Sequence, residues 1–214
     1  MQNNTFKFYS EYNLPVLLGK KATNIYELLD GIKTVPASSV YYHTHKFLKQ
    51  HHYLIPEPPN DFAYWIRNVL VQPKLGEMIA SINIASFESL EELRNRIIEV
   101  LENHERSAYG INCQNGFEFQ FMSCKTFWFK NNYEANNLIE FYDIMQKIDI
   151  SVFFANIFGP KLRHGKKNNN FSKWFEIIGE TELAHKVSNI DPYTMTLEGL
   201  RTQILKLIKQ YGKH

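Results

Sequence analysis

The sequence predicts a mainly α-helical protein, built from two tandem, pseudo-symmetric helical repeats that pack together, with one or two short β-strands. Three observations lead to this prediction. Apolar residues recur at helical spacing through most of the chain, blocks of the first half return in order in the second, and only two short segments alternate apolar and polar residues. The predicted domains are repeat 1 at residues 1–108 and repeat 2, a degenerate copy, at residues 109–214, which share one core or a large interface.

The repetition is visible when the chain is aligned with itself. ATNIYELLDGIKTV from Ala22 recurs as ANNLIEFYDIMQKI from Ala135, and SLEELRNRIIEVL from Ser89 recurs as TLEGLRTQILKLI from Thr196. The shorter pairs are FKF with FEF, SVYYHTHKF with SVFFANIFG, and NDFAYW with NNFSKW. Because every block keeps its place in the order, an internal duplication explains the pattern better than chance.

The first repeat is expected to begin with a strand and to continue as helices. FKFYS alternates apolar and polar residues, as does FEFQFMS in the second repeat, so the two segments could pair as strands. A first helix is predicted at residues 21–32 and ends before Pro36. Ser38 or Ser39 can then cap a second helix that runs toward residue 51.

The remaining helices follow the proline-rich stretch PEPPND. Asn60 or Asp61 can cap a third helix, and a short fourth element covers residues 75–82. The last helix of the repeat opens with Ser89 and Glu92 at the spacing of a capping box. The second repeat follows the same plan, so roughly ten helices are expected in all.

The composition is that of a soluble cytoplasmic protein. With 44% hydrophobic and 14% aromatic residues the chain can fill a core, and 24 Lys+Arg against 22 Asp+Glu favour no polyanionic partner. No signal-like start or long apolar run is present, so no membrane contact is expected. Cys113 and Cys124 match no disulfide framework or zinc spacing, and no cofactor is predicted.

Residues present in both repeats are expected to serve the shared fold. Glu27 with Glu140 and Arg94 with Arg201 are the charges that recur. Each glutamate is predicted to pair with the arginine of its own repeat and so to join the first helix to the last. The alternative is that the arginines anchor a ligand in a cleft between the repeats. Trp65 and its counterpart are expected in the core, each with its indole N–H hydrogen-bonded.

The segment SVYYHTHKFLKQHHY carries four histidines, and the second repeat does not keep them. Ala155 stands opposite His43, and Ile157 stands opposite His45. On one helix these two histidines project about 200° apart, and no histidine pair has the i, i+4 spacing that suits chelation. We therefore interpret His43 as a hydrogen-bonded, partly buried residue and place His45 on the outer face of the helix.

A small-molecule or metal-dependent activity is the alternative hypothesis for the same region. Asp61 stands opposite Asn170, and a carboxylate beside His43 could orient and charge an imidazole, although helix capping is the competing role. The catalytic candidates are His43, Asp61 and Tyr42. The candidate metal ligands are His43, His51, Glu57 and Asp61. The candidate ligand-binding residues are His45, Trp65, Arg94 and Arg201.

The second repeat has a basic stretch of its own, KLRHGKKNNN, which we interpret as a solvated loop. Its clustered cations make nucleic acid or phosphate a further candidate ligand, although the stretch lacks interleaved aromatic residues for stacking. The residues that would carry this binding are Lys161, Arg163, Lys166 and Lys167.

The blocks GKKATNIYELL, SVYYHTH, NDFAYW and SLEELR, with their weaker second copies, resemble an uncharacterised prokaryotic family of tandem helical-repeat proteins, a domain of unknown function. The resemblance covers nearly the whole chain and implies an architecture, but it transfers no catalytic residues. The sequence also lacks a P-loop, G-x-S-x-G, G-x-G-x-x-G and H-E-x-x-H. These observations favour a non-enzymatic protein-binding or regulatory module with a protein partner of unknown identity.

Overall fold

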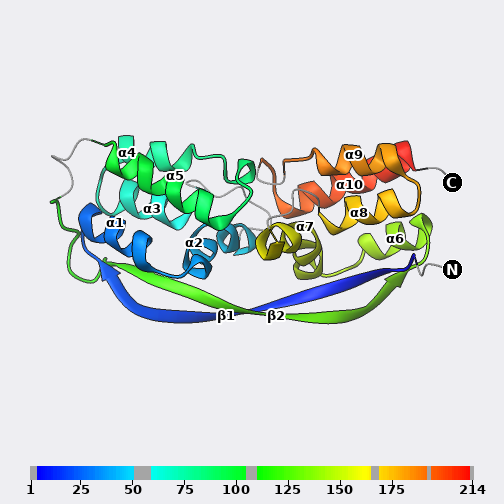
Figure 1. Cartoon of the computed structure of the whole chain (residues 1–214), viewed down its shortest axis with the longest axis horizontal. Helices are drawn as coiled ribbons and strands as arrows, with labels where there is room; N and C mark the ends of the chain where they lie inside the picture. Colours follow the sequence, from blue (N-terminus) through cyan, green and yellow to red (C-terminus); the bar gives the residue numbers. More distant parts are fainter. Residues whose placement is uncertain (1–3, 51–58, 105–109, 165–168, 192–193, 213–214) are drawn as a thin grey trace. The chain divides into compact units, whose positions relative to one another are not determined.

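A computed structural model of the chain describes residues 4–50, 59–104, 110–164, 169–191 and 194–212 (Figure 1). In these residues it has two strands and ten α-helices. The strands are β1 (Phe6–Ala22) and β2 (Phe119–Ala135), each 17 residues long. They pair as a two-stranded antiparallel sheet, so the expectation that the two strands pair is confirmed. Ser10 lies beside Asn131, however, so the segments FKFYS and FEFQFMS do not face each other.

The prediction of a mainly α-helical fold with short strands is wrong, because the two strands extend far beyond FKFYS and FEFQFMS. The fold is mixed, with a long β-ribbon beside the helices. Pro15 and Gly19 lie inside β1, although both residue types usually signal a turn. In a two-stranded sheet every strand is an edge strand, and a proline without an N–H is tolerated there.

The helices agree with the sequence in number and order. The first half contains α1 (Ile25–Thr34), α2 (Ala37–Gln50), α3 (Asp61–Asn68), α4 (Pro73–Ala80) and α5 (Leu90–Glu102). The second half contains α6 (Leu138–Met145), α7 (Ile150–His164), α8 (Asn170–Ile177), α9 (Thr181–Ser188) and α10 (Leu197–Tyr211). Side-chain oxygens cap six of them at matching places in the two halves, from Asn24, Asn60, Ser89, Asn137, Asn169 and Thr196.

The chain forms two compact units, and each is discontinuous in sequence. The α1–α5 unit comprises the described residues between 13 and 50 and between 59 and 125, and the α6–α10 unit comprises residues 4–12 and the described residues from 126 onward. The start of β1 therefore belongs with the helices of the second half. The start of β2 belongs with the helices of the first half.

Residues 4–9, which we call the N-terminal Phe-x-Phe segment, pack into the core of the α6–α10 unit. The ring centroid of Phe6 lies 5.3 Å from that of Phe141 and 5.5 Å from that of Trp174. Phe8 stacks on Phe141 at 5.5 Å. The indole Nε1 of Trp174 donates a hydrogen bond of 2.5 Å to the carbonyl oxygen of Asn4. Both segment phenylalanines are buried.

Residues 117–122, which we call the internal Phe-x-Phe segment, pack in the same way into the core of the α1–α5 unit. Phe119 stacks on Phe62 at 5.3 Å and meets Trp65 edge-on at 5.7 Å. Trp65 Nε1 donates a hydrogen bond of 2.7 Å to the carbonyl oxygen of Phe117. Both indoles are thus buried and hydrogen-bonded, as the sequence predicted. Burying a phenylalanine contributes roughly 1.5–3 kcal/mol, so each segment is a main component of its unit's core.

Val71, which follows α3, adopts a left-handed backbone conformation with a φ of 55° while its side chain is 74% exposed. That conformation costs an ordinary residue roughly 1–2 kcal/mol, and the corresponding turn after α8 places Gly179 there with a φ of 87°. Val71→Gly is therefore expected to raise the free energy of unfolding by about 0.5–1 kcal/mol, because the strain removed exceeds the added flexibility of the unfolded chain. Denaturant titration measures the change.

Val69 supplies the matched control for this substitution. It ends α3 with a φ of −98°, which an L-residue adopts without strain. Val69→Gly should therefore lower the stability that Val71→Gly raises. Equal losses from both substitutions would contradict the strain at Val71.

Candidate functional site

α2 and α3 bring His43 and Asp61 together, as the sequence suggested. His43 Nδ1 lies 2.8 Å from Asp61 Oδ2. Asn60 is the N-cap of α3, and its side chain accepts the hydrogen bond of the Ala63 N–H. The prediction that Asp61 caps this helix is therefore wrong. As the first residue of α3, Asp61 directs its carboxylate to the imidazole instead.

The opposite side of the His43 ring contacts the start of β2. The backbone N–H of Met122 donates a 2.9 Å hydrogen bond to His43 Nε2. Since a backbone amide only donates, Nε2 must be an unprotonated acceptor, and the ring proton sits on Nδ1 and is donated to Asp61. We call His43, Asp61 and the Met122 N–H the His43 clamp. It joins α2, α3 and β2.

The histidine ring of the clamp is buried among aromatic side chains. The His43 side chain is only 3% exposed, and its ring lies 4.7 Å from that of Phe119 and 5.3 Å from that of Phe62. Burial raises the pKa of the neighbouring Tyr42 phenol, and the negative charge of Asp61 raises it further. While the clamp is intact, His43 has no lone pair for a metal and no free position for a substrate proton.

The second half keeps a link of the same kind without a histidine. Asn156 Nδ2, on α7, donates to the carbonyl oxygens of Tyr9 at 3.0 Å and Val152 at 2.8 Å, and Asn170 Nδ2, on α8, donates to Asn156 Oδ1 at 3.2 Å. The matched contacts of Phe6 with Trp174 and of Phe119 with Trp65 make Tyr9 equivalent to Met122, and the repeat alignment pairs Asn170 with Asp61. We call this the Asn156 clamp. In each unit two helices are tied by polar side chains to the same position of a strand.

The other residues proposed for a ligand or metal site are placed as follows. His45, expected on the outer face of its helix, is buried, with Nδ1 lying 2.8 Å from Thr44 Oγ1, so that prediction is wrong. Trp65 belongs to the core described above. His51 and Glu57 lie outside the described residues. In the described part of the chain, no group of three or more His, Cys, Asp or Glu residues could hold a metal ion.

The recurring charges do not pair between the first and last helices, so that prediction is wrong. The carboxylate of Glu27 accepts hydrogen bonds from the backbone and hydroxyl of Thr23, at 2.7 and 2.9 Å. Arg94 lies 3.4 Å from Glu91 within α5, and Arg201 lies 3.4 Å from Glu198 within α10. Both arginine side chains are 12% exposed, so each is largely packed against its own unit.

Glu140 repeats the arrangement of Glu27 at the start of α6. Its carboxylate accepts a 2.8 Å hydrogen bond from the Asn136 backbone N–H. This hydrogen bond is the main reason that the pKa of Glu140 lies below its ordinary value. The shared glutamates are thus part of the helix starts.

The basic stretch divides at the end of a helix. Lys161 and Arg163 belong to α7, which continues to His164, so this part of the stretch is helical and the loop interpretation is wrong for it. Lys166 and Lys167 lie outside the described residues.

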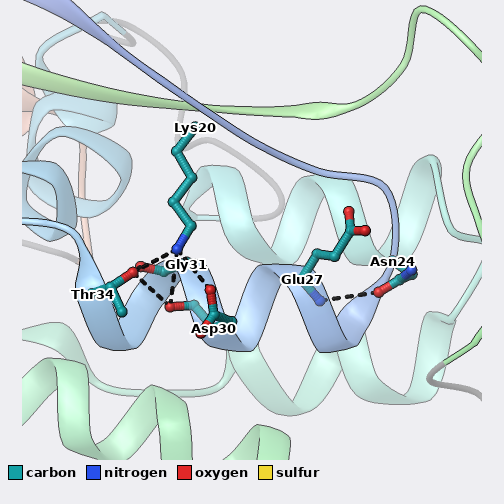
Figure 2. Close-up of polar contacts among 6 residues, drawn as sticks. All are labelled: Lys20, Asn24, Glu27, Asp30, Gly31 and Thr34. Atoms are coloured by element: carbon teal, nitrogen blue, oxygen red, sulfur yellow. Dashed lines mark hydrogen bonds and ion pairs between the residues drawn. The ribbon is translucent and has the colours of Figure 1, made fainter.

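Lys20, near the end of β1, makes a polar contact that the sequence did not reveal (Figure 2). Its Nζ lies 2.7 Å from Asp30 Oδ2 and 2.6 Å from Thr34 Oγ1, at the C-terminal end of α1. A cation is favourable there because of the helix dipole. Since the groups are partly exposed, the contact contributes only about 0–1 kcal/mol, and it secures the strand on the helix.

Four exposed aromatic side chains follow one face of the ribbon in the α6–α10 unit. They are Tyr12 (59% exposed), Phe127 (46%), Phe129 (55%) and Tyr133 (38%). Asn131 Nδ2 donates a 3.0 Å hydrogen bond to Ser10 Oγ, so these two side chains share a face. Strand alternation then places the four aromatics on that same face, which also carries the buried Phe6 and Phe8, and we call the four exposed side chains the aromatic row. The sequence interpretation missed the row because it ended both strands too early.

The model of a family described as "Family of unknown function (DUF5752)" matches residues 3–209. The chain belongs to this family. The prediction of an uncharacterised family is confirmed at that level. The structure of OrfY from Thermoproteus tenax is similar to this DUF5752 protein, with a TM-score of 0.83 and 25% sequence identity over 97% of this chain and 95% of that one. No curated protein matches the sequence.

Among the described residues of this DUF5752 protein, no helix combines the length and apolar character needed to cross a bilayer.

Proposed function

We propose that this DUF5752 protein is a non-enzymatic binding module of the cytoplasm, which holds a partner protein on its aromatic row. The observation that carries the proposal is the exposure of four aromatic side chains on one face of the two-stranded ribbon. Monomeric proteins rarely expose contiguous apolar surface without a use, and aromatic residues are enriched where protein interfaces gain most of their affinity. The row has the composition of such an interface.

The state of the His43 clamp supports binding over catalysis. An acid–base residue must reach a substrate proton, whereas both ring nitrogens of His43 are engaged inside the fold. The acidic partner, Asp61, is held by the same imidazole. An activity at this position would first require β2 to leave α2. The clamp therefore serves as an internal link in the proposed module.

We also propose that the two halves descend from one duplicated repeat. The matched Phe-x-Phe and tryptophan contacts of the two units support this origin. After a duplication, both copies keep such contacts if the residues that form them stay buried. The aromatic row is found in one unit, as expected if binding was acquired after the duplication.

The proposal is tested by comparing the proteins that three tagged forms retain from an extract of the source organism. The forms are the unaltered chain, Phe127→Ser/Phe129→Ser, and the control Ile139→Ser/Ile177→Ser. The two control residues are 62% and 60% exposed in the same unit, outside the row. Quantitative mass spectrometry measures retention.

A partner protein should be retained by the unaltered chain and the control, and reduced at least about tenfold with the row variant, which corresponds to about 1.4 kcal/mol. Thermal melts verify that all three forms are folded. Identical retention by the row variant and the unaltered chain would contradict the proposed function.

A further inference from the structure

We propose that the α6–α10 unit accepts the N-terminal Phe-x-Phe segment of a second copy of this chain, so that two copies form a strand-exchanged dimer. The binding groove is already defined, because the chain's own segment lies in it. The same segment of another copy presents the same atoms to that groove. Its binding is independent of the partner proposed for the aromatic row.

The groove recognises both the backbone and the side chains of an extended segment. Trp174 Nε1 holds the carbonyl oxygen of Asn4, and Asn156 Nδ2 holds that of Tyr9 at 3.0 Å. Between these bonds Phe6 enters a site formed by Phe141, Phe171 and Trp174, with ring centroids 5.1 to 5.6 Å apart. Such contacts depend on the segment's sequence and not on which copy supplies it.

The same mode of binding occurs twice in one chain. In the α1–α5 unit, Trp65 holds the carbonyl oxygen of Phe117, and Phe119 and Phe121 are buried. Here, too, the segment comes from the other half of the sequence. Both helical sets are therefore completed by a strand that their own half does not supply. Exchange between copies extends an arrangement that already exists between halves.

The proposed exchange requires a hinge in β1 just after the segment. Residues up to Tyr12 belong to the α6–α10 unit, and Asn13 begins the part that belongs to the other unit. Pro15, two residues further, is exposed and has no N–H to donate to the sheet. A change of direction between Tyr12 and Pro15 would carry the segment to another copy, and β1 could then pair with the partner's β2.

The energetics predict when the dimer forms. Groove contacts are the same in monomer and dimer, so exchange gains little free energy and is governed by concentration. The tethered segment has an effective concentration on the order of millimolar for its own groove. A second copy competes when the protein approaches that concentration and when the segment has first been released.

The test uses full-length copies in which Cys113 and Cys124 have been replaced by serine and alanine. One copy carries Ser10→Cys and the other carries Asn131→Cys. In the native chain the side chains of Ser10 and Asn131 form a hydrogen bond. The two are unfolded together in urea, refolded at about 1 mM, and treated with a short bismaleimide. Gel electrophoresis under denaturing conditions then reveals a covalent heterodimer, because these positions meet only when the segment of one copy lies in the groove of the other.

We expect a heterodimer that falls at least tenfold when refolding is carried out near 1 µM, far below the effective concentration of the tethered segment. Adding Phe6→Ala/Phe8→Ala to the Ser10→Cys copy should remove it, because the segment then cannot fill the groove. A single copy with both cysteines must cross-link within itself, which establishes the reach of the reagent. Absence of the heterodimer at 1 mM, or an equal yield with Asn132→Cys on the opposite strand face, would overturn the proposal.

Discussion

Replacing Gly31 with isoleucine is expected to lower the free energy of unfolding by about 3 kcal/mol or more, and alanine by about 1–2 kcal/mol. A Cβ at Gly31 would lie 2.0 Å from Cζ of Phe121, whose side chain is fully buried. The ring cannot move aside freely, because Phe119 and His43 contact it at centroid distances of 5.0 and 6.3 Å. The gain of about 0.5–1 kcal/mol from removing a helical glycine offsets only part of this overlap.

Urea unfolding measures the loss, and hydrogen exchange followed by mass spectrometry localises it to the α1–α5 unit. Gly199→Ala is the matched control, because its Cβ would meet only Thr196 Oγ1 at 3.1 Å and Met195 Cβ at 3.7 Å. It should leave stability within about 0.5 kcal/mol of the original value. Phe121→Leu should recover part of the loss in the Gly31→Ala background. A Gly31→Ala protein as stable as the unaltered chain would refute the close contact.

The Gly31 contact illustrates which parts of the fold the sequence could predict. Periodicity located the helices, and the repeat alignment matched Trp65 with Trp174. Its match of FKF with FEF was out of register by two residues, because Phe119, and not Phe117, contacts Trp65 as Phe6 contacts Trp174. A buried strand face, however, does not reveal which helices cover it. The reason for a glycine at residue 31 lies outside its own helix, because the ring that fills the space of its missing side chain is Phe121, which comes from the other half of the sequence. The exchange of strand starts between the halves was invisible for the same reason.

The candidate site was predictable to a similar extent. The replacement of Asp61 by Asn170 in the second half pointed correctly to a carboxylate beside His43. The third member of the clamp, the Met122 N–H, is a backbone group and leaves no signal in the sequence. The predicted Glu27–Arg94 pair was wrong because each residue interacts with a near neighbour in the sequence. Glu27 bonds to Thr23, and Arg94 lies beside Glu91. Recurrence showed that these charges serve the fold, but it did not identify their partners.

Replacing His43 with alanine is expected to lower the free energy of unfolding by about 3 kcal/mol, since it creates a cavity beside Phe62 and Phe119 and removes the acceptor of the Met122 N–H. Urea unfolding gives the magnitude. Hydrogen exchange should show faster exchange of the Met122 amide. His185→Ala removes a histidine from the surface of α9 and should change stability by less than about 0.5 kcal/mol.

The Asn156 clamp offers a test of whether the role of His43 is purely structural. The triple variant His43→Ala/Thr44→Asn/Asp61→Asn installs, at equivalent positions, the side chains that link α7, α8 and β1 in the other unit. If His43 acts as a link between helices and strand, the new amide can donate to the carbonyl of Met122, as Asn156 does to that of Tyr9. We expect the triple variant to regain at least about 1 kcal/mol relative to His43→Ala, the net contribution of one or two hydrogen bonds. A triple variant less stable than His43→Ala would mean that the two clamps are not interchangeable, and that the histidine has requirements beyond joining the three elements.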